Sequence, residues 1–352
     1  MKIDIIGSQL IDHADSAFPT LIKLDNGNLI CGFCRGNGPE IAGGSHWARS
    51  TDNGDTWQYE GVILPRTEER DGRHAVNTLR LSRCADGRAI AYGQRNYITD
   101  STKFGTVKNE AVYCVSDPLV KTWSGPRVLP LPYKCPVEIS NPILVLHDGR
   151  RLAPFTLLPD QDHLGEKVMV LESSDEGGTW DREYTVLADP ERKKGFFEKK
   201  IIETAPGHLL AFAWAVELGT YRDYNNHFAI SADGGRSWTP PRETGLTGQT
   251  LTPLWLGDRK FLLIYNFRRQ PQGIRVALAD IDGKDCRIEE DDYLWTPGQR
   301  TGSTREGIDS FDDFAFGLPS AMRLDDRTFL AVFWCKEDGV FGIRTIKFQL
   351  TR

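Results

Sequence analysis

The sequence predicts an all-β fold, a six-bladed β-propeller that occupies residues 1–352 as one domain. An eight-residue pattern, S-x-D-x-G-x-(T/S)-W, occurs three times, at residues 50–57, 173–180 and 231–238. Turn signals between two apolar, strand-like segments occur six times, at intervals of roughly 50 to 65 residues, as expected of large propeller blades. Helix signals are poor because Gly, Pro and Thr interrupt every candidate window. Repeated hairpins of this size are typical of a propeller.

The eight-residue pattern contains the residues that a tight hairpin turn needs. Its Asp side chain accepts hydrogen bonds from nearby backbone N–H groups, its Gly takes a positive φ, and its Trp covers the base of the turn. Degenerate copies lie at residues 116–123 (SDPLVKTW) and 279–283 (ADIDG). We therefore expect the pattern to be structural and to carry no chemistry.

The six hairpins are each centred on a polar turn. The turns lie at residues 25–27, 85–87, 147–149, 205–207, 257–259 and 325–327. The strands that precede them lie at residues 19–24, 77–81, 142–146, 198–204, 250–256 and 319–324. The last unit, residues 316–349, has room for only three strands, and an apolar segment at residues 3–6 precedes the first unit. We expect the N-terminal strand to complete the sixth blade, which would remove an exposed edge.

The eight-residue pattern resembles the Asp-box repeat of the sialidase (neuraminidase) superfamily. In that family the box closes a hairpin on the outer side of a propeller blade. The resemblance covers nearly the whole chain as architecture, and it implies a carbohydrate-active protein with its ligand at one end of the central channel.

Composition limits the partners. With 39% hydrophobic residues, 26% charged residues and a net charge of -6, the chain is typical of a globular protein. No apolar run is as long as a membrane span, and the basic residues form no cluster, so we expect neither a membrane nor a nucleic acid as partner. Seven cysteines are an odd number, which argues against a disulfide framework, and the first residues lack a signal-peptide pattern. The expected location is the cytoplasm, or outside the cell if a signal peptide has been removed.

No cofactor is expected, because glycine-rich phosphate loops and metal-ligand spacings such as H-E-x-x-H are absent. The pair Cys31 and Cys34 has the spacing of a redox or zinc motif, but no second pair completes it. The acidic residues 309–313 leave a bound calcium ion as an alternative.

The ligand site is expected where the inner strands begin. If each inner strand starts at the upper face, the long loops between blades surround the mouth of the channel there. Polar residues near the starts of the inner strands are Asp15, His74, Asn77, Glu138, Asn141, Glu198, Gln249, Asp309, Asp312 and Asp313. Residues near the ends of the second strands are Arg35, Arg95, Trp214, Tyr265, Arg268 and Trp334. Carboxylates, arginines and aromatic walls suit a carbohydrate, and the arginines suit an acidic one.

Glu198 is the strongest single candidate. Residues 197–203, followed by residues 207–210, resemble the sialidase segment that carries the glutamate beside the nucleophile. The predicted catalytic residues are Glu198, Glu138, Asp312 and His74. The predicted substrate-binding residues are Arg35, Asn77, Arg95, Trp214, Tyr265, Arg268 and Trp334.

Most of the sialidase catalytic signature is absent. The family's Arg-Ile-Pro element, its acid/base aspartate, its second arginine and its tyrosine nucleophile are matched here by Ala17-Phe18-Pro19, Gly43-Gly44, Trp214, and Leu318 or Pro319. Only Glu40 lies near the expected aspartate, and either Arg268 or Arg269 could stand for the third arginine. A standard retaining sialidase is therefore not expected.

Three hypotheses for function remain, and an oligosaccharide or glycan is the partner in each. The first is a glycoside hydrolase that acts on an acidic or highly hydroxylated sugar through paired carboxylates. The second is a polysaccharide lyase that uses His74 or Tyr265 as base and an arginine to neutralise a uronate. The third is a non-catalytic sugar-binding propeller in which Trp214, Trp334 and Tyr265 stack on sugar rings. The oligomeric state stays open.

Overall fold

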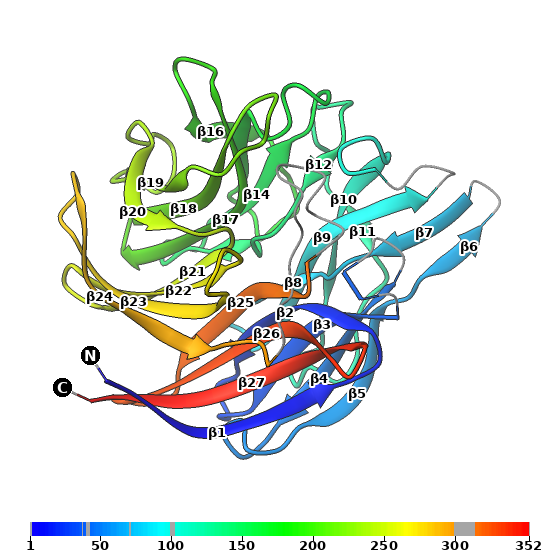
Figure 1. Ribbon diagram of the computed structural model, residues 1–352. Helices are drawn as coiled ribbons and strands as arrows, with labels where there is room; N and C mark the ends of the chain where they lie inside the picture. Colours follow the sequence, from blue (N-terminus) through cyan, green and yellow to red (C-terminus); the bar gives the residue numbers. More distant parts are fainter. Residues whose placement is uncertain are drawn as a thin grey trace.

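The computed structural model describes residues 2–36, 38–39, 43–69, 72–98, 103–298 and 314–351. In these ranges the chain forms six antiparallel sheets, which follow one another around a common centre (Figure 1). The predicted six-bladed propeller is confirmed. None of the described residues forms a helix with the length and apolar character of a membrane span.

Each blade is one sheet. Blade 1 contains β2 (Ser16–Lys23), β3 (Leu29–Arg35), β4 (Gly44–Ser50) and β5 (Gln58–Leu64). Blade 2 contains β6 (Thr67–Glu69), β7 (Gly72–Val76), β8 (Arg80–Arg83), β9 (Ala89–Ile98), β10 (Asn109–Val115) and β11 (Arg127–Val128). Blade 3 contains β12 (Val137–Glu138), β13 (Leu144–Val145), β14 (Arg151–Leu157), β15 (Lys167–Ser173) and β16 (Arg182–Ala188).

The second half of the chain is more regular. Blade 4 contains β17 (Lys194–Ala205), β18 (His208–Glu217), β19 (Asn225–Ser231) and β20 (Arg242–Thr247). Blade 5 contains β21 (Leu251–Gly257), β22 (Lys260–Phe267), β23 (Gly273–Ile281) and β24 (Cys286–Trp295). Blade 6 contains β25 (Phe316–Arg323), β26 (Thr328–Glu337), β27 (Val340–Thr351) and, as its outer strand, β1 (Lys2–Asp12).

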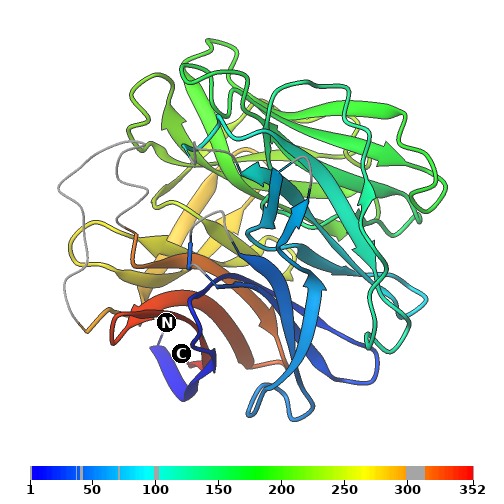
Figure 2. The same cartoon turned by 90° about the vertical axis from the view of Figure 1, so that its right-hand side faces the viewer.

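The two ends of the chain close the ring. β1 pairs antiparallel with β27, from Lys2 opposite Thr351 to Asp12 opposite Ile343. The termini consequently lie side by side at the same end of blade 6 (Figures 1 and 2). This pairing confirms the prediction that the N-terminal strand completes the last blade.

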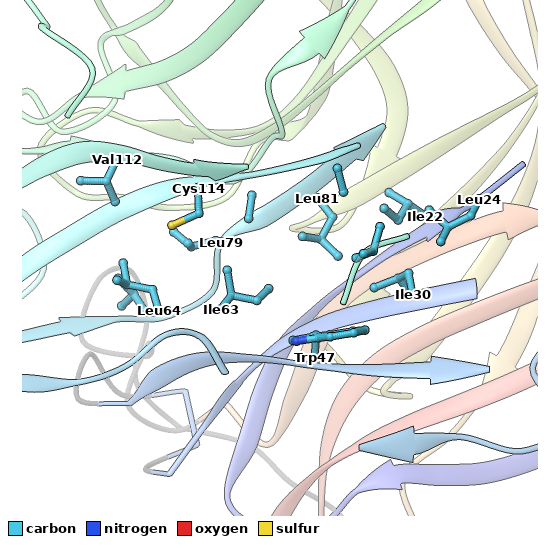
Figure 3. Close-up of a cluster of buried hydrophobic side chains, with 14 residues drawn as sticks. Ile22, Leu24, Ile30, Trp47, Ile63, Leu64, Leu79, Leu81, Val112 and Cys114 are labelled. Carbon is cyan, nitrogen blue, oxygen red and sulfur yellow. The ribbon is translucent and has the colours of Figure 1, made fainter. Parts of the chain in front are cut away.

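The hydrophobic core lies between the blades. Six buried clusters each combine residues of two neighbouring blades. Between blades 1 and 2, for example, Ile30 and Trp47 pack with Leu79, Leu81 and Val112 (Figure 3). A blade thus buries both of its faces, which explains why apolar runs such as residues 29–34 do not alternate with polar residues.

The three Asp boxes have the expected turn geometry. In blade 4, Asp233 accepts hydrogen bonds from the Ser231 hydroxyl at 2.8 Å and from the Ser237 N–H at 2.9 Å. The Gly235 N–H donates to the Ser231 hydroxyl at 2.8 Å, and Gly235 has a positive φ of 88°. Equivalent bonds occur in the other two boxes. The boxes close the turns between the third and fourth strands of their blades, as predicted.

The boxes also connect neighbouring blades, a role that the sequence did not reveal. A backbone carbonyl of each box turn accepts a hydrogen bond from a side chain of the preceding blade. The pairs, which include the degenerate copy in blade 2, are Gln9 to Gly54, Arg49 to Val120, Tyr113 to Gly177 and Arg150 to Gly234. The box tryptophans, Trp57, Trp123, Trp180 and Trp238, pack against the same four interfaces between blades. Each box therefore attaches its blade to the one before it.

Arg150 also pairs with a buried carboxylate, and its loss should destabilise the protein. Its guanidinium is 2.5 Å from the Glu172 carboxylate, whose side chain is only 1% exposed. Replacing Arg150 by Ala leaves that charge in a buried site, so we expect the free energy of unfolding in urea to fall by about 3 kcal/mol. The matched control is Arg182→Ala, since Arg182 is 58% exposed and 3.5 Å from the same carboxylate. That variant should lose less than about 1 kcal/mol, and equal losses would contradict the proposed connection.

The box aspartates should make stability depend on acid pH. Hydrogen bonds from Thr56 lower the pKa of Asp52 to about 2, and those from Thr179 and Ser173 lower the pKa of Asp175 to about 2. In the unfolded chain the value is about 3.9, so this stabilisation is complete above about pH 4 and is lost as the pH falls toward about 2. We expect the urea midpoint to fall over this interval. The Asp175→Asn variant should be less stable at neutral pH but should lose less on acidification, and parallel curves would refute the assignment.

Candidate functional site

Three inner strands contain the same irregularity at corresponding positions. Register shifts occur after Ala17 in β2, after Phe197 in β17 and after Gly317 in β25. The next residue in each strand has a positive φ, which is 56° at Phe18, 51° at Glu198 and 45° at Leu318. For residues other than glycine this conformation costs about 1–2 kcal/mol and is concentrated at functional sites. In blades 2 and 3 the inner strand is interrupted altogether, between β7 and β8 and between β12 and β13.

The bulge in β17 directs consecutive side chains into different surroundings. Glu198 is partly exposed, whereas the Lys199 side chain is fully buried between blades 3 and 4. The Lys199 ammonium donates to the Glu138 carboxylate at 2.9 Å and to the Glu138 backbone carbonyl at 2.5 Å. Lys200 donates to the backbone carbonyl of Ser140. One local distortion therefore places three charged groups of β17 against β12 and the residues that follow it.

The two glutamates of this group have opposite pKa shifts. Burial raises the pKa of Glu198, and the negative charge of Glu138 raises it further. Its Oε2 atom is buried and has no hydrogen-bond partner. Burial also acts to raise the pKa of Glu138, but the adjacent Lys199 ammonium outweighs it and the pKa is lowered. The surroundings thus favour the neutral form of Glu198 and the ionised form of Glu138, relative to an ordinary glutamate.

Two arginines come close enough to Glu198 to interact with its charge. Arg80, the first residue of β8, is buried and donates to the Phe18 carbonyl at 3.0 Å, on the bulge of blade 1. Arg268 follows β22, donates to the Phe316 carbonyl at 2.9 Å and to the Gln249 side chain, and lies 3.6 Å from the Phe314 ring. Burial lowers the pKa of Arg268 to about 9. Both guanidiniums are therefore anchored on neighbouring blades.

These charged side chains form one group, which we call the central cluster: Arg80, Glu138, Glu198, Lys199, Lys200 and Arg268. Glu138, Glu198 and Arg268 were predicted as site residues, and the structure brings them together. Arg80 was missed, and the two lysines had been considered only as partners of Glu198 at a strand end. An arginine within the apolar segment at residues 77–81 was the available signal for Arg80. Asn77 lies in the interruption three residues earlier, and its Oδ1 atom is buried without a partner.

Other predicted residues belong to separate groups. Arg35 is 3.3 Å from Asp12 of blade 6 and stacks on the Tyr59 ring of the outer strand at 4.7 Å. Arg95 pairs with Glu110, which lies on the neighbouring strand β10. His74 is buried, with its ring centroid 4.5 Å from that of Tyr97, which also donates to Glu110.

The three predicted aromatic residues lie within the packing between blades. Trp214, Tyr265 and Trp334 are 5%, 2% and 1% exposed. The Trp214 indole donates to Asp223 at 2.8 Å, and the Tyr265 hydroxyl donates to Asp291 at 2.8 Å. Trp334 lies beneath Arg268, 5.8 Å from its guanidinium carbon. Their burial leaves little ring surface for a sugar to contact.

Asp312, with Asp309, Asp313 and Glu40, lies outside the described residues. Within the described ranges, no group of three or more His, Cys, Asp and Glu side chains is placed to hold a metal ion. The seven cysteines are free thiols, and burial raises the pKa of Cys34 to about 12.

Comparison with known proteins identifies one sequence family. The model of the BNR repeat-like domain matches residues 110–285, which is half of the chain. No curated protein sequence matches the chain significantly.

Solved structures with the same fold have diverged far in sequence. A protein of unknown function from Dyadobacter fermentans has a TM-score of 0.78 at 21% identity and is covered over 99% of both chains. An α-L-arabinofuranosidase from Fusarium graminearum has a TM-score of 0.65 at 12% identity, with 99% of this chain and 98% of that one covered. A Trypanosoma rangeli sialidase has a TM-score of 0.64 at 14% identity, over 96% of this chain and 54% of that one. The present chain therefore spans about half the length of that sialidase.

The close packing of Arg268 gives a test of the site's geometry. A Cβ atom added at Gly317 would overlap the Nη2 atom of Arg268. The Gly317→Ala variant should therefore displace the guanidinium from the Phe316 carbonyl and lower the melting temperature by several degrees, because a buried charge loses its partners. Gly125→Ala is the control, since nothing lies within 4 Å of its added Cβ. Equal melting temperatures for the two variants would show that Arg268 is not held as described.

Proposed function

Because the chain belongs to the BNR repeat-like domain family, we propose that it is a carbohydrate-active enzyme of sialidase-like fold, a glycoside hydrolase. The proposed substrate is an oligosaccharide or glycan with an acidic or highly hydroxylated sugar. Two of the structures that share the fold are a sialidase and an α-L-arabinofuranosidase, both named for action on glycosides. Fold alone does not determine chemistry, so the proposal depends on the central cluster.

The observation that carries the proposal is that the surroundings shift the pKa values of Glu138 and Glu198 in opposite directions. Two carboxyl groups whose surroundings separate their pKa values are suited to acid and base roles in one reaction. Glu198 would donate its proton to the glycosidic oxygen as the bond to the anomeric carbon breaks. Glu138, ionised beside Lys199, would act as the base for water or as the nucleophile.

The cations of the central cluster support the choice of sugar. When Glu198 is protonated, the cluster has more positive than negative charge, because Arg80, Lys199 and Arg268 are opposed by Glu138 alone. An acidic sugar would bring the missing negative charge, and hydroxyl groups would suit acceptors such as the buried Oδ1 atom of Asn77. Asp312 stays a candidate acid, and Arg35, Arg95, Trp214, Tyr265 and Trp334 stay candidates for substrate contact.

A proton NMR time course with a panel of uronate- and ulosonate-terminated oligosaccharides tests the proposal. A new reducing-end anomeric signal would support hydrolysis, and the first anomer formed would distinguish inversion from retention. A vinylic signal would show that the reaction is an elimination and not a hydrolysis, and His74 would then be the candidate base. Line broadening without product would favour a binding protein.

Replacing Glu198 by Gln should abolish proton donation with little effect on folding. We expect turnover of a substrate found in this panel to fall by roughly 100-fold to 10,000-fold, because the amide has no acidic proton. The melting temperature should change by only a few degrees, since Gln has the same shape as the protonated side chain. The control is Glu176→Gln, which alters a glutamate with a 75% exposed side chain in an Asp-box turn. Turnover of Glu198→Gln close to that of the control would refute the assignment.

A further inference from the structure

Two buried polar atoms of the central cluster have no hydrogen-bond partner, and they belong to groups of opposite charge. One is Oε2 of Glu198, and the other is Nε of Arg80. Among the charged groups that shift the pKa of Arg80, Glu198 has the largest effect. Buried polar atoms in native proteins are nearly always paired, so an unpaired donor and an unpaired carboxyl oxygen in one charged cluster require an explanation.

The other cations near Glu198 donate hydrogen bonds to other groups. Lys199 donates to the side chain and the backbone of Glu138. Lys200 donates to the Ser140 carbonyl, and burial lowers its pKa to about 7, so it is only partly charged at neutral pH. Arg268 is bound to the Phe316 carbonyl and to Gln249.

Arg80 differs from these cations in the way it is held. One terminal nitrogen, Nη1, is bound to the Phe18 carbonyl, and the guanidinium carbon lies 5.8 Å from the Phe18 ring. The bulge in β2 thus fixes the side chain, while Nε is left without a partner. Among the described cations that act on Glu198, Arg80 is the one with a buried nitrogen that has no hydrogen-bond partner at all.

We propose that Arg80 is a positioning residue for Glu198, the counter-ion that stabilises its carboxylate after proton transfer. The inference rests on the proposed hydrolase function. When the Glu198 carboxyl gives its proton to the leaving oxygen, the C–O bond breaks, the sugar alcohol departs, and a buried anion is left on Glu198. If Glu138 is the nucleophile, it bonds to the anomeric carbon as the alcohol leaves, and water then breaks that bond, adds its hydroxyl to the carbon and gives its proton to Glu198. If Glu138 is the base, it takes the proton of the attacking water, and Glu198 regains a proton from solvent. An unpaired buried anion is costly, and Arg80 offsets that cost during the interval between the two proton transfers.

All the charged groups that act on Glu198 agree with this division of roles. Burial and Glu138 of β12 favour the protonated state, whereas Lys200 of β17, then Arg80 of β8 and then Lys199 of β17, in decreasing order of effect, favour the ionised state. Arg268, after β22, also interacts with the Glu198 charge. In the resting protein, burial and Glu138 together outweigh the cations and raise the Glu198 pKa. Arg80 would therefore pair with Glu198 only after the proton has left.

The titration of Glu198 without substrate tests this inference. Protein labelled with 13C at the glutamate carboxyl is titrated by NMR, and the Glu198 resonance is assigned by its loss in Glu198→Gln. In Arg80→Gln we expect the Glu198 pKa to rise by about one pH unit or more, because a neighbouring positive charge has been removed. Arg83→Gln on the same strand is the matched control, since Arg83 is 40% exposed and pairs with Asp25, and it should leave the Glu198 pKa unchanged.

Arg80→Lys is the second variant, because it retains the charge but lacks Nε. It should raise the Glu198 pKa by less than Arg80→Gln does. If Arg80→Gln does not fold, the titration is made on Arg80→Met, which also lacks the charge, and a Glu198 pKa equal to that of the unsubstituted protein in this variant overturns the proposal. An unchanged Glu198 pKa in folded Arg80→Gln also overturns it.

Activity gives an independent readout. On a glycan hydrolysed in the NMR panel, Arg80→Gln should lower kcat by roughly 100-fold and should move the alkaline limit of the pH profile upward with the Glu198 pKa. Normal kcat with a shifted Glu198 pKa would refute the counter-ion role but not the hydrolase function. Since the titration uses no substrate, its result does not depend on whether the protein hydrolyses a glycan.

Discussion

Pairing between the two ends of the chain is the constraint on which this propeller depends. Every blade buries its two faces against its neighbours, so a ring open at one interface would expose two apolar sheet faces. The register from Lys2 opposite Thr351 to Asp12 opposite Ile343 joins β1, which leads directly into blade 1, to the sheet of blade 6, and so holds the two blades of that interface together. Gln9 and Lys347, on the two paired strands, then bind the turn of the first Asp box, so closure and the attachment of blade 1 are one structural event.

A closed ring brings six inner strands together around a narrow channel, and regular pairing cannot continue to its mouth in every blade. The chain breaks the pairing at corresponding levels, by positive-φ bulges at Phe18, Glu198 and Leu318 and by interrupted strands in blades 2 and 3. These breaks free backbone carbonyls that would otherwise be paired. The Phe18 carbonyl binds Arg80. The irregularities therefore build the charged cluster directly.

The sequence predicted the features that depend on local turn chemistry. It did not predict side-chain partners that depend on the direction in which a side chain leaves its strand. Asp boxes and hairpin turns are local signals, so the six blades and the closing strand could be derived. Glu138, Glu198 and Arg268 were found because they are polar residues at strand ends. Lys199 was not assigned to Glu138, because a bulge reverses the alternation from which strand faces are deduced. Arg35 and Arg95 bind carboxylates supplied by other strands, which no local pattern reveals.

The central cluster contains buried charges that cost free energy, and their presence in a stable fold needs an explanation. Lys199 is fully buried, and replacing a buried ion pair by apolar residues is often neutral or stabilising, so stability alone does not account for the Lys199–Glu138 pair. A positive φ at Glu198 and an unpaired guanidinium nitrogen at Arg80 add further cost. All three costs fall within the central cluster, on residues that contact Glu138 or interact with the charge of Glu198. Strain and unpaired polar atoms concentrated around Glu198 are the arrangement expected if the proposed hydrolase transfers a proton from that carboxyl group.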